Sequence, residues 1–421
     1  MTAGVKDDRT IAPDDPPPVG AVGASARFVR QRERILDAAT ALLNQKGVWG
    51  MTLQEVAAAL DLKTSSVTYY FRRREQLAAA VFENSLSRLA AIAESAGCEA
   101  TPRARIGRYV ELFVRQFACA LRNEVRPFAI LSEIRAMDEP TRSALIKQYQ
   151  GVFRTVRAFF GPADTEARKR LNTARTHILN EALFWAEVWL PRFAIGDLPN
   201  VQRRLIDVLA DGLAARGTEW SAASALPRLA PAASDQEAFL RTATRLINDF
   251  GYKGASINRI ASELHRAKTT FYRHIDGKDD LVAECSRDSH RRLADLRRSA
   301  ADASGSAWEH CATTLRRALG LQFIGEYPLL RSSALQAMPM SIRETAVERS
   351  ERTALGLMDL LIGAMQEGTA RIVDPLIASH VVMSAIDAFY DLKGWRRDMA
   401  SDEAIEVYMS VLANGVIDAG A

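Results

Sequence analysis

Residues 63–77 read KTSSVTYYFRRREQL, and residues 267–281 read AKTTFYRHIDGKDDL. Each stretch passes from lysine and small hydroxyl residues through aromatic residues to a basic residue, an acid and a leucine. The two stretches begin 204 positions apart in a chain of 421 residues. A pattern that recurs at so long a period indicates duplication of a whole domain, because solenoid repeats recur about every 20–50 residues.

The similarity continues upstream of both stretches without a gap. Residues 34–77 align with residues 238–281 at the same offset of 204. Apolar positions in the aligned segments recur every three or four residues, which favours helices over strands. Shared residues of the first repeat include Leu36, Ala39, Leu42, Gly47, Gly50, Ala57, Leu60 and Leu77. Their partners are Leu240, Ala243, Leu246, Gly251, Gly254, Ala261, Leu264 and Leu281.

Each repeat predicts a bundle of three helices. In the first repeat, the first helix runs from about residue 28 to residue 45. Gly47 and Gly251 follow the first helices and are suited to stop them in a left-handed C-cap. The second helix starts at Thr52, where Glu55 three residues later completes a capping box.

The second and third helices of each repeat are joined by a tight turn. Ser256 can cap the second helix of repeat two, although Arg259 stands where an acid would complete the box. After that helix come Asp61 and His265, residue types that tolerate a positive φ. The third helix begins almost at once and is rich in Thr, Ser, Tyr and Arg, which is typical of a helix-turn-helix motif.

These residues resemble the TetR family of bacterial one-component transcription regulators. The second repeat resembles the family pattern at Ser256, Ile260, Ala261, residues 270–275 and residues 278–281. The first repeat does so at Thr52, Val56, Ala57, residues 66–71 and residues 74–77. It departs from the pattern at Thr68, where the family has tyrosine. The resemblance implies a DNA-binding regulator in the bacterial cytoplasm, associated with the nucleoid when it is bound to DNA.

The repeat and the composition together predict an all-α chain. Two helix-turn-helix DNA-binding three-helix units would each be followed by a helical-bundle regulatory domain. Pro227 and Pro231 block helix continuation between the halves. The expected segments are a disordered tail (1–26), a first DNA-binding domain (27–80), a first regulatory and pairing domain (81–216), a linker (217–235), a second DNA-binding domain (236–284) and a second regulatory and pairing domain (285–421).

Positive charge is concentrated in the repeated segments. Residues 27–74 and residues 239–278 carry +5 each, whereas the net charge of the chain is +4, so the remainder carries −6. This distribution is expected of a polyanion-binding surface on an acidic body. The candidate DNA contacts are Lys63, Thr64, Ser65, Ser66, Thr68, Tyr69, Tyr70, Arg72, Arg73, Arg74, Lys268, Thr269, Thr270, Tyr272, Arg273, His274 and Lys278.

The remainder of each repeat has helical periodicity and no Gly-rich phosphate loop, nucleophile elbow or paired acid and base. Resemblance to the family implies a sensor for a small apolar or aromatic effector here. Candidate lining residues are Phe113, Phe117, Met137, Tyr149, Phe153, His177, Phe323, Tyr327, Met338, Met358 and Met383. Candidate pairing residues at the end of each half are Phe184, Trp185, Trp189, Phe389, Tyr390 and Trp395.

Several function classes are disfavoured by the sequence. The four cysteines form no CxxC pair or zinc spacing, and they are expected to be free thiols in a reducing compartment. No apolar run approaches the length of a membrane span, and the N-terminus does not resemble a signal peptide. We therefore expect a cytoplasmic protein without a metal or cofactor, and not an enzyme.

A helix-turn-helix of this kind usually works as a dimer that reads two half-sites one DNA turn apart. With both copies on one chain, the sequence predicts an intramolecular pseudo-dimer, more readily a ligand-responsive repressor than an activator. Because the two recognition segments differ, we expect an imperfect or asymmetric operator. The sequence leaves open an alternative in which one copy reads DNA and the other serves pairing or sensing, and further homodimerisation. A helical enzyme or small-molecule carrier is a remote alternative.

Overall fold

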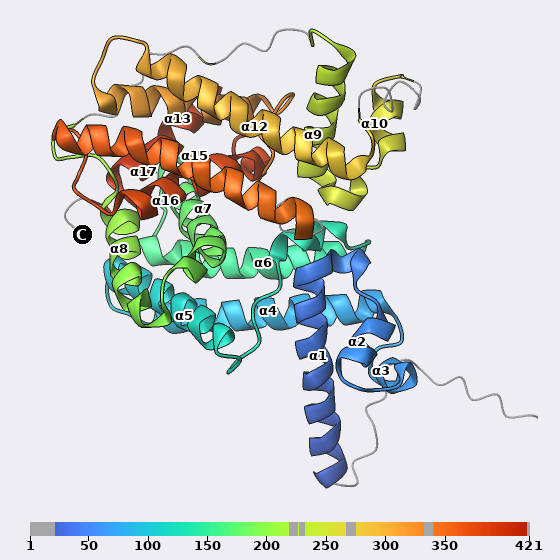
Figure 1. The fold of residues 1–421 in the computed structure, drawn as a ribbon. Helices are drawn as coiled ribbons and strands as arrows, with labels where there is room; N and C mark the ends of the chain where they lie inside the picture. The colour runs from blue at the N-terminus through green and yellow to red at the C-terminus, as the bar shows by residue number, and fades with distance from the viewer. Residues whose placement is uncertain (1–21, 219–225, 227–231, 267–274, 332–339, 419–421) are drawn as a thin grey trace, which may run out of the picture.

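The computed structural model describes residues 22–218, 226, 232–266, 275–331 and 340–418. Throughout these residues the regular elements are helices, and one isolated antiparallel bridge joins Ala214 to Ala370. The predicted all-α fold is therefore confirmed. Within the same residues, none of the helices combines the length and apolarity needed to cross a bilayer. Figure 1 shows the N-terminal half in blue to green below the C-terminal half in yellow to red.

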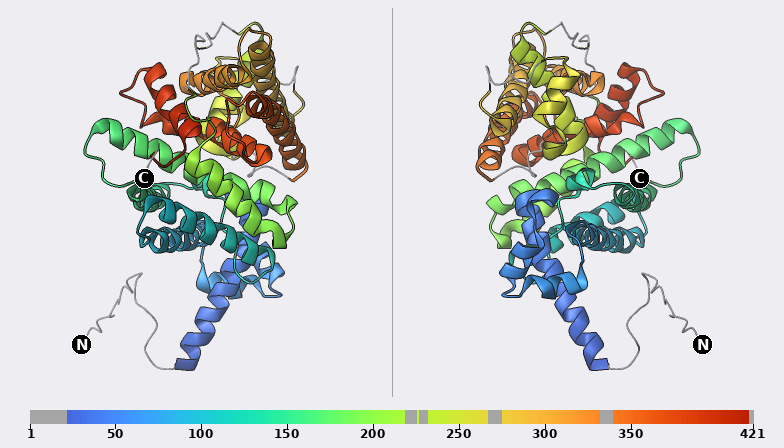
Figure 2. Two further views of the ribbon diagram at one scale, coloured as in Figure 1. Left: turned by 90° about the vertical axis from the view of Figure 1, so that its left-hand side faces the viewer. Right: turned by 90° about the vertical axis from the view of Figure 1, so that its right-hand side faces the viewer.

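The first three-helix unit consists of α1 (Val22–Gly50), α2 (Leu53–Ala59) and α3 (Thr64–Tyr70). We call these helices, with the first turn of α4, the first head. Helix α1 begins six residues before the expected start near residue 28, and its N-terminal part projects away from the rest of the chain (Figures 1 and 2). The early start is a correction, since part of the expected disordered tail is helical.

The second unit repeats this arrangement with α9 (Asp235–Gly254) and α10 (Ile257–Glu263). We call these helices, with the first turn of α12, the second head. Residues 267–274, where the second recognition helix is expected, lie outside the described residues. The heads lie at the same side of the molecule in Figure 1, one above the other.

Equivalent positions of the two heads have almost the same unusual backbone angles. Asp61 and His265 have φ of 54° and 52°, so the predicted positive φ in the turn is confirmed at both. Gly47 and Gly251 have φ of 71° and 73°, but their ψ values of 172° and 173° are extended. The expected left-handed C-cap is therefore wrong in detail. The chain kinks at each glycine and then adds one more helical turn.

The N-terminal cap of the second helix in each head also agrees with the prediction from the sequence. The Glu55 amide donates to the Thr52 hydroxyl over 3.1 Å, and the Glu55 carboxylate accepts from the Thr52 amide over 3.1 Å. In the second head the Arg259 amide donates to the Ser256 hydroxyl over 3.2 Å, without the reciprocal bond. The capping box in one head and the single cap in the other are both confirmed.

A helical body follows each head, and the helices of the two bodies correspond in order. The first body contains α4 (Arg74–Gly97), α5 (Pro102–Leu121), η1 (Leu131–Ala136), α6 (Thr141–Arg157), η2 (Ala158–Phe160), α7 (Glu166–Trp189), η3 (Leu190–Arg192), η4 (Ile195–Asp197) and α8 (Leu198–Asp211). The second contains α12 (Lys278–Ala301), α13 (Ala307–Ile324), α15 (Met340–Gln366), α16 (Pro375–Ala388), η5 (Phe389–Lys393) and α17 (Ser401–Asn414). Most of the expected linker between the halves lies outside the described residues.

The last helices of the two bodies pack against each other. Helix α7 lies against α16 and α17, and α8 lies against α16. The Trp189 ring stacks on the His380 ring, with centroids 5.3 Å apart, and the Trp185 indole N–H donates to His380 Nδ1 over 3.4 Å. The Trp395 indole N–H donates to the Arg170 carbonyl of the first half over 3.2 Å. Buried apolar residues of both halves consequently form one continuous core.

The remaining pairing candidates have other positions. Phe389 is buried in this core within its own half, where its ring centroid lies 4.8 Å from that of Tyr408. The Tyr390 hydroxyl donates over 3.0 Å to Asp249 of α9, so Tyr390 holds the second head to its own body. Phe184 lies in the wall of a cavity described below.

Backbone hydrogen bonds also join the two halves of the chain. After α8, the Leu213 amide donates to the Ala413 carbonyl over 2.9 Å. After α17, the Val416 amide donates to the Leu209 carbonyl over 2.8 Å. Side chains add to this junction, because Asp418 of the second half forms ion pairs with Arg168 and Arg175 of the first. The two halves are thus joined by paired backbone as well as by side chains.

Candidate nucleic-acid interface and ligand cavity

Helix α3 presents a polar, exposed N-terminal face. Val67 is fully buried in the core of the first head, and this fixes the rotation of the helix. Lys63, Thr64 and Ser65 are exposed at the N-terminal end of the helix. The short hydroxyl side chains of Thr64 and Ser65 keep the surface narrow enough for close approach to base edges in a major groove. Ser66 is half-buried beside them.

Aromatic side chains at the end of α3 divide between packing and exposure. Tyr70 packs against Phe28 of α1, with ring centroids 4.7 Å apart. Tyr69 meets both rings edge-on but remains 73% exposed. The Thr68 hydroxyl donates to the Ser65 carbonyl of its own helix over 3.1 Å. Tyr69 is therefore the aromatic residue of α3 that is placed to meet a ligand.

Cations surround the start of α4. Arg72 and Arg73 are exposed. Arg74 is more constrained, because its guanidinium lies 4.5 Å from the Trp49 ring centroid and 2.6 Å from the Glu75 carboxylate. Lys278 repeats the first of these contacts in the second head, with its ammonium 4.4 Å from the Tyr252 ring centroid. The other second-head candidates, Lys268, Thr269, Thr270, Tyr272, Arg273 and His274, lie outside the described residues.

A cavity of about 470 Å³ lies behind the first head, between α4, η1, α6 and α7. Of the expected lining residues, Tyr149, Phe153 and His177 line it. Phe113 and Met137 are instead fully buried in apolar cores, and Phe117 is half-buried beside one of them. The second half also contributes to the wall, through Arg331, Asp391 and Leu392.

Charged residues that the sequence did not single out line the same cavity. Burial raises the pKa of Glu181 and of Glu187 to about 7. Burial also lowers the pKa of Arg135 to about 10, and the nearby charge of Arg331 adds to this shift. His177, whose pKa burial lowers to about 4, lies with its Nδ1 3.0 Å from the Tyr408 hydroxyl. One signal was available: Glu181 is four residues after His177, on an otherwise apolar helical stripe.

Hydrogen bonds connect the cavity wall to the first head. Asn44 of α1 donates to the Phe128 carbonyl over 2.7 Å and accepts from the Ile130 amide over 3.0 Å. Glu133 of η1 accepts from the Val48 amide over 2.9 Å. Both Phe128 and Ile130 line the cavity. Asn44 and Glu133 therefore link this wall to the end of α1.

The second head is connected to the same wall by the equivalent asparagine. Asn248 of α9 donates to the Leu329 carbonyl over 2.9 Å and accepts from the Arg331 amide over 3.1 Å. Arg135 of η1 donates to the Asn248 carbonyl over 2.7 Å. Because the Arg135 and Arg331 side chains both line the cavity, this one cavity contacts the supports of both heads.

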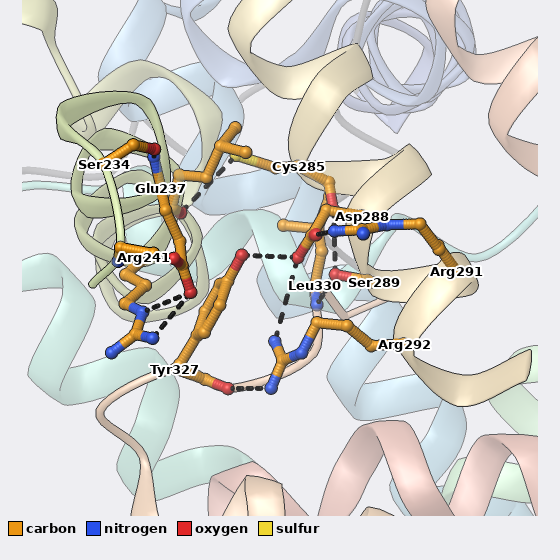
Figure 3. A network of polar contacts seen from close by, with 12 residues as sticks. Ser234, Glu237, Arg241, Cys285, Asp288, Ser289, Arg291, Arg292, Tyr327 and Leu330 are labelled. Atoms are coloured by element: carbon orange, nitrogen blue, oxygen red, sulfur yellow. Dashed lines mark hydrogen bonds and ion pairs between the residues drawn. The ribbon is translucent and has the colours of Figure 1, made fainter. Parts of the chain in front are cut away.

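Figure 3 shows a polar network between α9, α12 and the segment from Tyr327 to Leu330. Tyr327 lies between the guanidinium groups of Arg241 and Arg292, and its hydroxyl donates to Asp288 over 2.6 Å. The Leu330 amide donates to the Ser289 hydroxyl over 2.8 Å, as the Ala129 amide does to Ser85 over 2.9 Å in the first half.

Tyr327, expected in a ligand pocket, borders a separate and mostly polar cleft of about 650 Å³. Among the other second-half candidates, Met383 is buried in the core, and Phe323 and Met358 are half-buried. Met338 lies outside the described residues. In the second half, the described candidates therefore do not gather around one cavity.

The family profile "Bacterial regulatory proteins, tetR family" matches the chain twice, over residues 35–81 and 239–285. The two matches begin 239 − 35 = 204 residues apart, which is the offset of the repeat. Both heads therefore match the DNA-binding domain of the TetR family. Each match runs from α1 or α9 to the beginning of the following long helix, so the TetR-type DNA-binding domain is present in tandem.

One curated relative is an uncharacterized HTH-type transcriptional regulator in the dhlA 5'region of Xanthobacter autotrophicus. It is 39% identical over 56 residues, which span 13% of the present chain and 28% of that regulator. A similar solved structure is a TetR-family regulator from Bordetella parapertussis, with a TM-score of 0.36 and 20% identity over 42% of the present chain and 93% of its own. PfmR from Thermus thermophilus has a TM-score of 0.33 and 23% identity over 42% and 96%.

Proposed function

We propose that this tandem TetR-family chain is a ligand-responsive transcriptional repressor that binds one operator as an intramolecular pseudo-dimer. In this proposal the exposed face of α3, from Lys63 to Ser65 and including Tyr69, reads bases in the major groove. Arg72, Arg73 and Arg74 contact phosphates, and Lys278 does so in the second head. The division of the chain into the six segments expected from the sequence belongs to the same proposal, except that the first helix begins at Val22.

The observation that supports regulation best is the pair of asparagine clamps on one cavity. Asn44 holds the first head to the cavity wall, and Asn248 holds the second head to it. A ligand that moves η1 would therefore change the position of both heads at once. Such a ligand shifts the population towards a head spacing that no longer matches successive major grooves. DNA affinity then falls when the cavity is filled.

The two heads are expected to read different half-sites. The first presents KTSSVTYYF and the second KTTFYRHI, so their side chains offer different donors and acceptors. Because both heads belong to one chain, the second binds at the high effective concentration set by the first. The operator is therefore asymmetric, and one chain occupies it.

The test is a footprint of the full chain on the DNA upstream of its own gene, with the stoichiometry of the complex measured in parallel. One chain that protects two unlike half-sites on adjacent major grooves supports the proposal. Exchanging the bases of each half-site separately then shows whether both heads read sequence. Two chains on a symmetric site would contradict the pseudo-dimer, and indifference to one half-site would assign that head to pairing or sensing.

A further inference from the structure

The two arginines in the cavity wall are already engaged by protein groups. Arg331 forms an ion pair with Asp391, which lies in the same wall. Arg135 donates to the Asn248 carbonyl over 2.7 Å and to the Ser132 carbonyl over 3.2 Å. An anionic ligand would have to take these guanidinium groups from their present partners. Binding of an anion to this wall is therefore disfavoured.

The two glutamates in the wall, Glu181 and Glu187, differ from the arginines in their protein partners. Among the residues that the structure describes, no hydrogen bond or ion pair reaches the carboxyl group of Glu181 or Glu187. Arg135 and Arg331 attract Glu181 only at longer range. A carboxylate held away from bulk water without a partner costs free energy, which a cation placed beside it would recover.

The two carboxyl groups flank an aromatic surface. Glu181 and Glu187 are six residues apart on α7, which corresponds to about 9 Å along the helix axis. Phe184 lies between them in sequence and also lines the cavity. Phe128, Tyr149 and Phe153 complete the aromatic part of the wall. Aromatic faces attract cations as well as apolar surface, so they suit the same ligand as the carboxylates.

We propose that this cavity binds an organic cation with a hydrophobic, aromatic body, and that Glu181 and Glu187 are its counter-ions. The inference rests on the proposed function only in taking the cavity as the effector site. A purely apolar effector would leave both carboxyl groups without a partner, and the two glutamates therefore narrow the class of ligand. The cavity is completed by the second half, so one cation binds per chain.

Ionisation of the two carboxyl groups makes the affinity for a cation depend on pH. With pKa values of about 7, both carboxyl groups are largely protonated at pH 6 and largely ionised at pH 8. A permanent cation prefers the ionised form, so its affinity should rise across this interval by up to roughly tenfold per pH unit and carboxyl group. The charged or titratable groups that face Glu181 are Arg135, Tyr149, His177, Arg331, Asp387, Asp391 and Tyr408, and Arg88 faces Glu187.

The experiment compares two probes of the same shape and opposite charge on the full chain without DNA. Tetraphenylphosphonium and tetraphenylborate are titrated calorimetrically at pH 6 and pH 8. We expect the phosphonium to bind one per chain, more tightly at pH 8, and the borate to bind at least tenfold more weakly. Equal binding of the two ions, preference for the borate, or no binding of the phosphonium would overturn the inference.

Variants assign the effect to the two carboxyl groups. Glu181→Gln and Glu187→Gln keep the side-chain volume and should each weaken phosphonium binding by roughly tenfold, with loss of part of the pH dependence. Glu166→Gln is the matched control, because it makes the same change at an exposed position of the same helix. Unaltered affinity in both cavity variants would assign the binding to another site and overturn the inference.

Operator release is measured separately and tests the proposed function. If the phosphonium binds as described but the operator stays bound, the ligand class holds and the repressor mechanism fails. If the operator is released by the borate and not by the phosphonium, the mechanism holds and the ligand class fails. The two proposals can thus fail independently.

Discussion

Gly212 at the end of α8 and Gly415 at the end of α17 lie so close that neither could carry a side chain. A Cβ atom added to Gly212 would stand 2.3 Å from the Gly415 amide nitrogen and from the Ala413 carbonyl oxygen. A Cβ atom on Gly415 would stand 2.1 Å from the Ala210 carbonyl oxygen. Both glycines also have positive φ, of 68° and 82°. The backbone hydrogen bonds between the halves depend on this approach.

We therefore expect Gly212→Ala and Gly415→Ala to be strongly destabilising, by about 3 kcal/mol or more each, since overpacking adds to the backbone penalty. Urea unfolding curves measure the loss. The matched control is Gly368→Ala, because Gly368 has a φ of 73° but open space around its Cβ position. That variant should lose only about 1 kcal/mol. Equal losses in all three would show that the close approach is unimportant.

The exposed arginines before α4 give a test of phosphate contact. Arg72→Ala and Arg73→Ala should weaken binding to every DNA sequence alike. Each should also reduce the slope of log affinity against log salt concentration by about 0.9, because one fewer counterion is released. Arg203→Ala, on α8 and distant in the chain from either head, serves as control. A salt slope that stays the same in both arginine variants would remove them from the interface.

The two asparagine clamps should act on one head each. Asn44→Ala removes two partly buried hydrogen bonds between the first head and the cavity wall, and Asn248→Ala removes the equivalent, buried pair at the second. At saturating effector, we expect the first variant to keep protecting the first half-site while releasing the second, and the reverse for the other. Footprints resolve the half-sites. Simultaneous release in both variants would contradict separate coupling.

The cavity glutamates should make stability depend on pH. The folded-state pKa of Glu187 is about 7, above its usual value of 4.5, so the folded protein holds this proton more tightly than the unfolded chain. The cost of ionising the buried Glu187 carboxyl group reduces the free energy of unfolding. This cost is absent below pH 4.5, grows as the pH rises to about 7 and reaches its full value above that, at up to roughly 3 kcal/mol. Glu187→Gln should raise the free energy of unfolding at pH 8 and leave it nearly unchanged at pH 4.5. Equal effects at both pH values would refute this assignment.

The parts of the fold that sequence predicted well depend on local chemistry. The Thr52 hydroxyl reaches an amide three residues away, and Asp61 or His265 adopts its own positive φ, so neighbouring residues suffice to predict these features. The early start of α1 was missed because Val22 to Ala26 are small residues without an apolar stripe. The kink at Gly47 was misjudged because glycine permits several conformations at positive φ.

The cavity could be predicted only in part. Tyr149, Phe153 and His177 lie on single helices at inward positions, and helical periodicity places them correctly. Periodicity cannot tell a core position from a cavity wall, which is why Phe113 and Met137 were proposed as well. Arg331 and Asp391 come from the other half of the chain. No local pattern indicates such a contact, because it depends on how the two bodies pack.

The mutual burial of α7 and α8 against α16 and α17 has a consequence for a cell that contains other regulators of this kind. A protein that pairs through separate copies can exchange partners, form mixed assemblies with its relatives, and be inhibited by a defective copy. Here α7 and α8 are covered by α16 and α17 of the same chain. If one chain acts alone, as we propose, it is insulated from such exchange, and each recognition helix can change by mutation without changing the other.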